Sequence, residues 1–396
     1  ASVKALNQGV ATTDDPTFTN TQLAAIAQSK SVTATDVFVY DTSKDSDGGA
    51  WRNRTQNTSW YNEALNTSTR GATKKFPSVA VIVAESDTVT IYDGDDPAMP
   101  MWMVFQRPGT SSIAALGMLA VQTGIKSMML NGILVSSGRG SWGEGLSTIS
   151  FIAERAVYDK QHDVYVATQS IANRNLAAGY AVSTSAVGGI VSNVVNDVAM
   201  TVLPNAPIDA DTGLPVPTIA VATNGGVSVI KDDGSVVDIT WTNEGVVSRV
   251  NFNSLNNIQL VNSPSSAYQC YVKTYSIPNA DIADGAGYLQ GSALSFYTPT
   301  GAGQADLTLV VGGLLNAAQI ITEDYVGGTY GLSVLDENPA DYTKGMVDYI
   351  TSDYNTGWMN GDIKLATLSD TDTTNVTGSE LITNNSSFSN TTGWYL

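Results

Sequence analysis

Residues that commonly carry catalysis or bind metals are scarce in this chain. Its 396 residues include one cysteine, Cys270, and one histidine, His162. A single cysteine cannot form a disulfide within the chain, so we interpret Cys270 as a buried thiol and expect stability to come from packing. His162 lies beside Asp163, but no G-x-S-x-G motif supplies a nucleophile, so we expect a surface histidine rather than a catalytic triad. One His and one Cys also argue against a zinc site.

Charged residues are also few, and positive charge is the scarcer sign. They make up 14% of the chain, with 19 Lys and Arg against 37 Asp and Glu, which gives a formal net charge of −18. Nucleic acids and anionic membranes attract basic surfaces, so the composition argues against both as partners. No apolar run reaches the ~18 residues of a membrane-spanning helix, and no leader is visible at Ala1. The acidity is expected to keep a large particle soluble.

The chain does contain a repeated strand-and-turn pattern, which is clearest at residues 218–236. There, two runs rich in β-branched residues are joined by Asn224-Gly225-Gly226 and closed by Asp232-Asp233-Gly234. An Asn-Gly pair between such runs predicts a β-hairpin, because both residues tolerate positive φ. Related copies occur at residues 36–45, 78–97 and 329–339.

Strands that recur roughly every 8–12 residues, with Gly, Asn and Asp turns between them, predict an all-β fold. The repeating unit of roughly 40–50 residues matches a four-stranded blade of a β-propeller. Residues 36–370 would then form about six to seven blades. We expect an attachment arm at residues 1–35 and a C-terminal extension at residues 371–396. A pair of β-sandwiches is the alternative fold, but no change in composition marks the linker that it would need.

Two loops carry short motifs. Residues 47–51, Asp-Gly-Gly-Ala-Trp, are close to the Asp-box turn of sialidase-like propellers, which has one more residue before its Trp. We interpret them as a structural turn in which Asp47 accepts backbone N–H bonds while Trp51 packs beneath. Residues 138–143 satisfy G-x-G-x-x-G, but no strand–helix unit surrounds them, so we do not expect dinucleotide binding.

Acidic turns are the remaining candidates for metal binding or catalysis. Residues 93–96 and 370–375 could contribute to a calcium site, although the second begins like a calcium loop and then loses its spacing. Asp is common in turns because its side chain accepts backbone N–H bonds. Glycoside hydrolysis needs two carboxylates at a defined separation, and 37 acidic residues do not single out a pair. We therefore expect no metal, no cofactor and no enzymatic activity.

Both ends of the chain resemble tail proteins of bacteriophages. Residues 5–18, ALNQGVATTDDPTF, resemble a stretch that recurs in the shafts of tail fibres. Residues 41–71 and 354–372 resemble segments of tail proteins from marine and environmental phages. Residues 378–394 resemble the first strand of carbohydrate-binding jelly-roll modules, with Asn384-Asn385 in place of the usual Asn-Gly. A whole module of that kind needs roughly 100 residues more.

The resemblance implies a structural virion protein, a fibre or tail-tip component of an extracellular tail that contributes to host attachment. It implies other tail proteins, a host-surface glycan and further copies of the chain as partners, and we expect a homotrimer because fibres close by cyclic symmetry. The alternatives are a tail nozzle or hub protein, a polysaccharide-degrading tailspike and a secreted bacterial lectin. The candidate receptor-binding residues are aromatics that could stack on a sugar, with core packing as the alternative for each: Trp60, Tyr61, Trp142 and Trp358.

Overall fold

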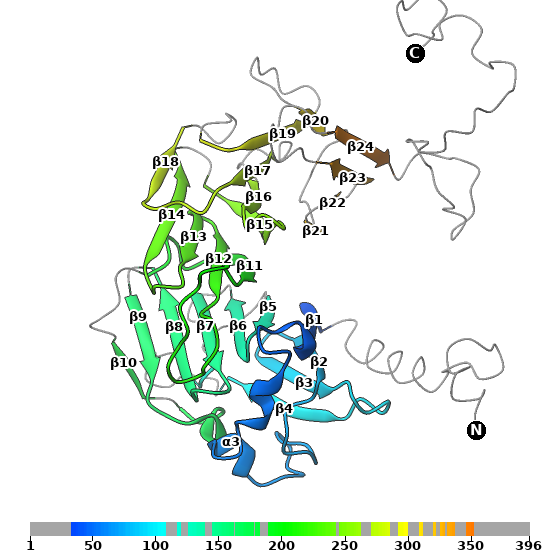
Figure 1. Ribbon diagram of the computed structural model, residues 1–396, viewed down its shortest axis with the longest axis vertical. Helices are drawn as coiled ribbons and strands as arrows, with labels where there is room; N and C mark the ends of the chain where they lie inside the picture. The colour runs from blue at the N-terminus through cyan, green and yellow to red at the C-terminus, as the bar shows by residue number, and fades with distance from the viewer. Residues whose placement is uncertain are drawn as a thin grey trace, which may run out of the picture. The chain divides into compact units, whose positions relative to one another are not determined.

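The computed structural model describes fifteen segments of the chain between residues 33 and 351 (Figure 1). They are residues 33–107, 117–119, 126–138, 145–161, 163–177, 179–182, 189–242, 245–262, 271–285, 292–299, 309–311, 320–321, 325–328, 331–336 and 346–351. Most of the expected arm at residues 1–35, and all of the extension at residues 371–396, lie outside these segments. His162 and Cys270 also lie outside them.

The described strands form five sheets. Sheet 1 contains β1 (Asp36–Asp41), β2 (Val79–Ala84), β3 (Thr88–Asp93) and β4 (Met101–Gln106). Sheet 2 contains β5 (Ser127–Leu130), β6 (Ile133–Gly138), β7 (Gly145–Ser150), β8 (Arg155–Lys160), β9 (Asp163–Ala167) and β10 (Tyr180–Val182). Sheet 3 contains β11 (Val195–Thr201), β12 (Thr218–Thr223), β13 (Gly226–Ile230), β14 (Val236–Trp241) and β18 (Ile282–Asp284).

Sheet 4 contains β15 (Val247–Phe252), β16 (Ile258–Asn262), β17 (Tyr271–Tyr275), β19 (Ser295–Pro299) and β20 (Leu309–Val311). Sheet 5 contains β21 (Ile320–Ile321), β22 (Tyr325–Gly328), β23 (Gly331–Asp336) and β24 (Met346–Thr351). The helical elements of the described segments are short: η1 (Thr42–Lys44), η2 (Ala50–Asn53), α3 (Ser59–Asn62) and η4 (Ile171–Asn173). Among the described residues, no helix has the length and apolar character needed to cross a membrane.

Each sheet is built mainly as an antiparallel meander, in which strands neighbouring in sequence are hydrogen-bonded neighbours in space. Sheets 1 and 5 have the predicted four strands, whereas sheets 2, 3 and 4 have more. The extra outer strand of sheet 3, β18, follows β17 of sheet 4 in sequence and pairs in parallel with β14. The chain therefore returns from sheet 4 to complete sheet 3, which ties the two sheets together.

Successive sheets contact one another through their first strands. The strand β1 contacts β5, β5 contacts β11, β11 contacts β15, and β15 contacts β21. Each of these strands lies at one edge of its own sheet. Consecutive meander sheets that face one another through their first strands are the arrangement of propeller blades. The prediction of an all-β propeller fold is confirmed at this level, while the number of six to seven blades stays a prediction.

Apolar clusters fill the interfaces between consecutive sheets. One cluster joins sheets 1 and 2, a second joins sheets 2 and 3, and a third joins sheets 3 and 4. Sheet 3 thus has both faces covered, and every residue of β12 is buried. A strand buried on both faces reads as a continuous apolar run, which explains the sequence Thr-Ile-Ala-Val-Ala-Thr. The face of sheet 1 that carries Val37 and Val39 differs, because these side chains are 57% and 59% exposed.

The predicted hairpin at Asn224-Gly225 is confirmed, and a second Asn-Gly pair also joins two strands. Asn131 and Gly132 join β5 to β6 with φ values of 51° and 72°, which is the positive region that such turns require. Asn224 and Gly225 join β12 to β13, where Thr223 pairs with Gly226. A side chain at Gly226 would bring its Cβ to 2.2 Å from the backbone oxygen of Ile239, so only glycine fits there.

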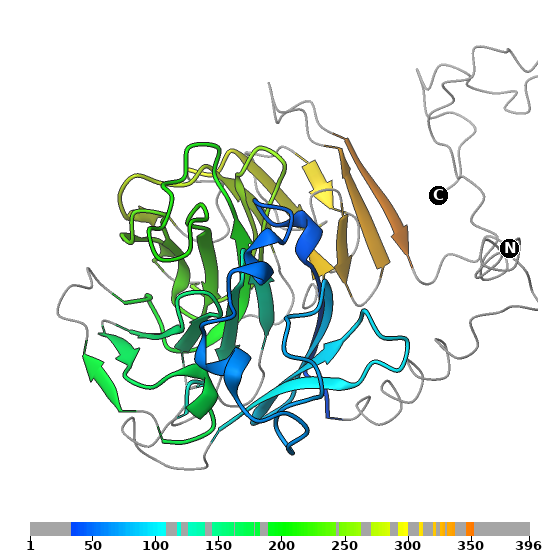
Figure 2. The same cartoon turned by 60° about the horizontal axis from the view of Figure 1, so that its bottom comes forward.

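A segment between β1 and β2, residues 42–78, is drawn in blue in Figure 2. Its aromatic side chains insert into the core between sheets 1 and 2. Trp51, Trp60 and Phe76 of this segment are fully buried. The Phe76 ring lies 4.8 Å from that of Trp102 in β4 and 5.2 Å from that of Phe151, as measured between ring centres. Edge-on aromatic contacts of this kind stabilise a core beyond the area that they bury.

The Asp-box-like turn is structural, as predicted, but the wrong carboxylate was assigned to it. Asp45, rather than Asp47, is the buried acceptor: its Oδ2 accepts the Trp51 Nε1–H at 2.7 Å, and its Oδ1 accepts the Asn131 N–H at 2.8 Å. The Tyr40 hydroxyl donates to Asp45 as well, at 2.5 Å. Asp47 instead forms an ion pair with Arg54. Asp45 can accept these hydrogen bonds because it lies where β1, the turn and the β5–β6 hairpin meet.

Charged side chains link the first strands of sheets 1 to 4. Asp36 of β1 accepts a hydrogen bond from Lys126 Nζ at 2.8 Å, just before β5. Asp197 of β11 accepts the Val250 N–H of β15 at 3.1 Å. Burial raises the pKa of Asp197 to about 6, although the positive charges of Arg249 and Lys126 oppose that shift. Opposite charges therefore alternate along the line of first strands.

Candidate functional site

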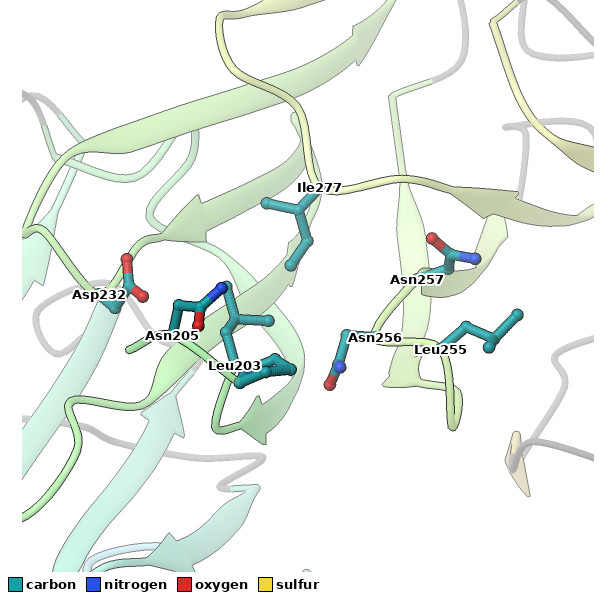
Figure 3. A pocket seen from close by; sticks show the side chains of 8 residues that line it. Leu203, Asn205, Asp232, Leu255, Asn256, Asn257 and Ile277 are labelled. Atoms are coloured by element: carbon teal, nitrogen blue, oxygen red, sulfur yellow. The ribbon is translucent and has the colours of Figure 1, made fainter. Parts of the chain in front are cut away.

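A surface pocket of about 440 Å³ lies where loops of sheets 3 and 4 meet (Figure 3). Its volume falls within the ~300–1,000 Å³ typical of small-molecule sites. Apolar and amide side chains dominate the lining, together with one carboxylate: Leu203, Pro204, Asn205, Asp232, Leu255, Asn256, Asn257 and Ile277. It is a candidate binding site among the described residues.

The meander topology explains why these loops share one end of their sheets. Connections of an antiparallel meander alternate between the two ends, so those that follow alternate strands lie at the same end. Leu203 and Asn205 follow β11, and Asp232 follows β13 in the same sheet. In sheet 4, residues 255–257 follow β15 and Ile277 follows β17. Four loops that leave two adjacent sheets at one end thus form the walls of the pocket.

The turn of sheet 4 is held rigid by its own hydrogen bonds. The Asn253 Oδ1 accepts the Leu255 N–H at 3.1 Å and the Asn257 N–H at 2.9 Å. Asn256 adopts a positive φ of 59°, which asparagine tolerates better than most residues. The Thr201 hydroxyl at the end of β11 donates to the Asn256 Oδ1 at 2.8 Å, so this lining residue of sheet 4 is tied to sheet 3.

The turn on the sheet 3 side is equally ordered. The Lys231 N–H donates to the Ser235 carbonyl at 2.8 Å, and the Gly234 N–H donates to the Lys231 carbonyl at 2.9 Å. Asp233 accepts from both the N–H and the hydroxyl of Ser235, which occupies its carboxylate within the turn. Asp232, the preceding residue, is the carboxylate that lines the pocket. Figure 3 shows Asp232 beside Asn205 and across the pocket from Asn256.

The chemistry of the lining residues suits binding. They include no His, Cys, Ser, Thr, Tyr or Lys side chain that could act as a nucleophile or a cationic general acid. They include a single carboxylate, whereas the usual glycosidase mechanism needs two. The amides and Asp232 can exchange hydrogen bonds with a ligand, and three aliphatic side chains can contact its apolar face.

The predicted receptor-binding aromatics do not line this pocket. Trp60 is fully buried, and its Nε1–H donates to the Phe151 carbonyl at 2.8 Å. A ring with no exposed surface cannot stack on a sugar, so the receptor-binding prediction for Trp60 is wrong and its core-packing alternative holds. Tyr61 is half-buried against the same core, with Lys74 Nζ 5.5 Å from its ring centre. Trp142 and Trp358 lie outside the described residues.

The acidic turn at residues 93–96 uses its carboxylates to hold backbone. Asp95 accepts the N–H groups of Ser78 and Val79, and Asp93 accepts the Asp95 N–H. Asp96 accepts the Ala98 N–H. No cluster of three or more His, Cys, Asp or Glu side chains suited to a metal occurs in the described part of the chain. Residues 370–375 lie outside it, so that calcium candidate stays a prediction.

The loop at residues 138–143 leads to another strand. Its first residue, Gly138, ends β6 and pairs with Gly145, the first residue of β7. A dinucleotide fingerprint leads from a strand into a helix, whereas this motif, whose residues after Gly138 lie outside the described segments, stands between two antiparallel strands.

A buried carboxylate in sheet 2 is a second unusual group. Asp159 of β8 is 7% exposed, and burial raises its pKa to about 7. It pairs through its backbone with Leu146 on β7 and Val164 on β9. Strongly perturbed carboxylates are candidates for function, but Asp159 does not line the pocket.

Comparisons with known proteins do not identify a family. No family model matches the chain, and no curated protein matches it. Among solved structures, the chain is similar to the β-propeller domain of Myceliophteria thermophila Cps50 (Swd1), with 10% identity over 69% of this chain and 83% of that one and a TM-score of 0.29. The Dos1 propeller is similar with 9% identity over 69% and 72% of the two chains and a TM-score of 0.29.

An auxiliary nutrient binding protein from Bacteroides thetaiotaomicron VPI-5482 is similar over 49% of this chain and 58% of that one, with 7% identity and a TM-score of 0.23. Scores this low carry no argument about fold or function. The architecture rests instead on the strand order and on the contacts between successive first strands.

Proposed function

We propose that this chain is a structural protein of a bacteriophage tail, a fibre or tail-tip component that contributes to host attachment and catalyses no reaction. The observation that carries the proposal is the resemblance of both ends of the chain, residues 5–18 and 354–372, to tail proteins. Apolar interfaces between its sheets stabilise the all-β body without a disulfide. Such a body suits a structural particle that bears mechanical load.

The pocket supports a binding role. Its single carboxylate and its lack of a nucleophilic side chain favour recognition over turnover. The excess of negative charge on the chain disfavours binding to nucleic acid, because the phosphate groups are also negatively charged. The partners of the proposed function are therefore other tail proteins, further copies of the chain in a homotrimer, and a glycan of the host surface.

The proposal includes a closed ring of propeller blades. We retain a propeller of about six to seven blades, with the described sheets as its successive members. The exposed valines of β1, Val37 and Val39, form an apolar face that the last blade of a closed ring would cover.

A tail nozzle or hub protein is the alternative within the same class, and the two differ in symmetry. Negative-stain electron microscopy of the purified chain would resolve three-fold particles for a fibre, whereas a ring of more copies would favour the nozzle. The tailspike alternative rested on the Asp-box-like turn at residues 47–51, whose Trp51 is buried and donates to Asp45.

The direct test of the function is the location of the chain in the virion. Tailed particles purified by density gradient from the source of this sequence would be digested and analysed by mass spectrometry. Peptides of this chain should co-purify with those of the major tail proteins in a fixed ratio. Peptides that are found in the bacterial fraction, and not in such particles, would contradict the proposal.

A further inference from the structure

Three polar side chains of the pocket, those of Asn205, Asp232 and Asn256, have hydrogen-bonding capacity that the described part of the protein does not use. In the described part of the chain, neither the Asn205 amide nor the Asp232 carboxylate makes a side-chain hydrogen bond within the protein, although neighbouring Asp233 is fully engaged by Ser235. The Asn256 Oδ1 is occupied by Thr201, which leaves its amide N–H groups for a ligand. Donors and acceptors therefore lie on both sides of the opening, with Asp232 and Asn205 on one side and Asn256 on the other in Figure 3.

The charge of the pocket restricts what it can hold. Asp232 is the sole charged side chain in the lining, and the chain as a whole carries a formal charge of −18. A phosphorylated, sulfated or sialylated ligand would meet repulsion with no cation to offset it. The ligand is therefore neutral, or carries its charge away from the pocket.

The apolar side chains define the other half of the ligand. Leu255 is 53% exposed at the rim, and Leu203 and Ile277 lie between the polar groups in Figure 3. A sugar ring presents a C–H face on one side and hydroxyl groups around its edge. Each hydroxyl both donates and accepts, so it matches an amide or a carboxylate equally well. An apolar peptide side chain would bury the same amides without satisfying their hydrogen bonds, which disfavours its binding.

Two of the four loops that form the pocket, at residues 231–235 and 253–257, are fixed by hydrogen bonds. The Thr201–Asn256 bond joins the two sheets, and the two turns are closed by internal hydrogen bonds. A preformed site loses little entropy when a ligand binds, which favours recognition of a weakly interacting neutral molecule.

We propose that the pocket formed by Leu203, Asn205, Asp232, Leu255, Asn256 and Ile277 binds a neutral saccharide. Asp232 and Asn205 accept and donate hydrogen bonds to adjacent hydroxyls at the ring edge, and Leu255 contacts its C–H face. The volume of about 440 Å³ admits one or two sugar units at the end of a longer chain. The proposal rests on the proposed function for the source of the saccharide, which would be the host surface.

The test uses the full chain and its variants against a panel of glycans. Neutral mono- and disaccharides containing glucose, galactose, mannose or N-acetylglucosamine form one arm, and sialylated and sulfated glycans form the other. The variants are Asp232→Asn, Asn205→Ala and, as a matched control, Asp211→Asn, which makes the same charge change on the exposed loop after β11. Thermal unfolding of each variant verifies that it is folded, and saturation-transfer NMR at millimolar sugar detects weak binding.

Binding of a neutral saccharide that falls at least tenfold in Asp232→Asn and Asn205→Ala, and not in Asp211→Asn, is the expected result. A tenfold loss corresponds to about 1.4 kcal/mol, in the range of one hydrogen bond. Binding that the two pocket variants leave unchanged, binding confined to anionic glycans, or no binding to any neutral sugar would overturn the proposal. Sugar binding that depends on Asp232 in a chain absent from tailed particles would instead refute the tail function and leave the pocket assignment standing.

Discussion

Asp159 offers a test of how deeply sheet 2 buries a carboxylate, through the pH dependence of stability. Its carboxylate lies in β8 at 7% exposure, and no hydrogen bond to it is found within the described residues. A charged carboxylate without a partner is costly to bury, so the folded chain retains a proton there to a higher pH than the unfolded chain does. Replacing it with Asn removes the titrating group and keeps its shape.

The sign and size of the effect follow from the two pKa values. Burial raises the pKa of Asp159 from 3.8 to about 7. Between these values the folded state holds more protons than the unfolded state, so the free energy of unfolding falls as the pH rises, and above pH 7 the loss is complete. The shift of about 3 pKa units corresponds to an upper limit of about 4 kcal/mol. Asp159→Asn should therefore match the wild-type stability near pH 4 and exceed it by roughly 2–4 kcal/mol at pH 8.

Urea unfolding followed by tryptophan fluorescence at pH 4, 6 and 8 would measure the difference. Asp163→Asn, an exposed position on the adjacent strand β9, is the control and should change stability by less than about 0.5 kcal/mol at every pH. A difference between wild type and Asp159→Asn that is constant across this range, or that shrinks toward pH 8, would refute the assignment of a buried, unpaired carboxylate.

Three further substitutions test other parts of the account. Gly226→Ala should destabilise the chain by more than about 2 kcal/mol in urea, because its Cβ would meet the Ile239 oxygen, whereas Gly234→Ala, with positive φ but open space, should cost about 1 kcal/mol. Asp45→Ala leaves three buried donors without an acceptor and should lower the unfolding free energy by about 3 kcal/mol or more. Trp60→Ala should cost about 3–5 kcal/mol. At a temperature where Trp60→Ala remains folded, its saccharide affinity should be unchanged; a selective loss of sugar binding would restore Trp60 as a receptor contact.

Local sequence signals predicted the strands and tight turns well. The hairpin at Asn224-Gly225 and the turn at Gly234 lie where the sequence predicted them, although the positive φ in the hairpin belongs to Gly226 rather than to the Asn-Gly pair. These features depend on contacts between residues close in sequence. The return of β18 to sheet 3 could not be predicted in this way, because its parallel pairing with β14 spans about 40 residues of intervening chain.

The pocket was missed because its residues resemble ordinary turn residues. Asn256 and Asp232 belong to polar turns of a kind that occurs throughout the chain, and only the juxtaposition of two sheets brings them together. The prediction that Trp60 contacts a receptor failed for a different reason. A Trp among amides in a long loop is typical of an exposed residue, whereas Trp60 is buried. Trp51 and Phe76 belong to the same loop as Trp60. Several large aromatic side chains in one loop indicate that the loop packs into the core, and this feature of the sequence could have predicted the burial of Trp60.

The central claim, that this chain is a sugar-binding structural component of a phage tail, is tested most directly by locating it on intact particles. Gold-labelled antibody raised against the purified chain would be imaged on tailed virions by electron microscopy. We predict label confined to the tail, at the fibres or the tip. Label on capsids, on cell surfaces without particles, or on none of the virions that contain the gene would contradict the account.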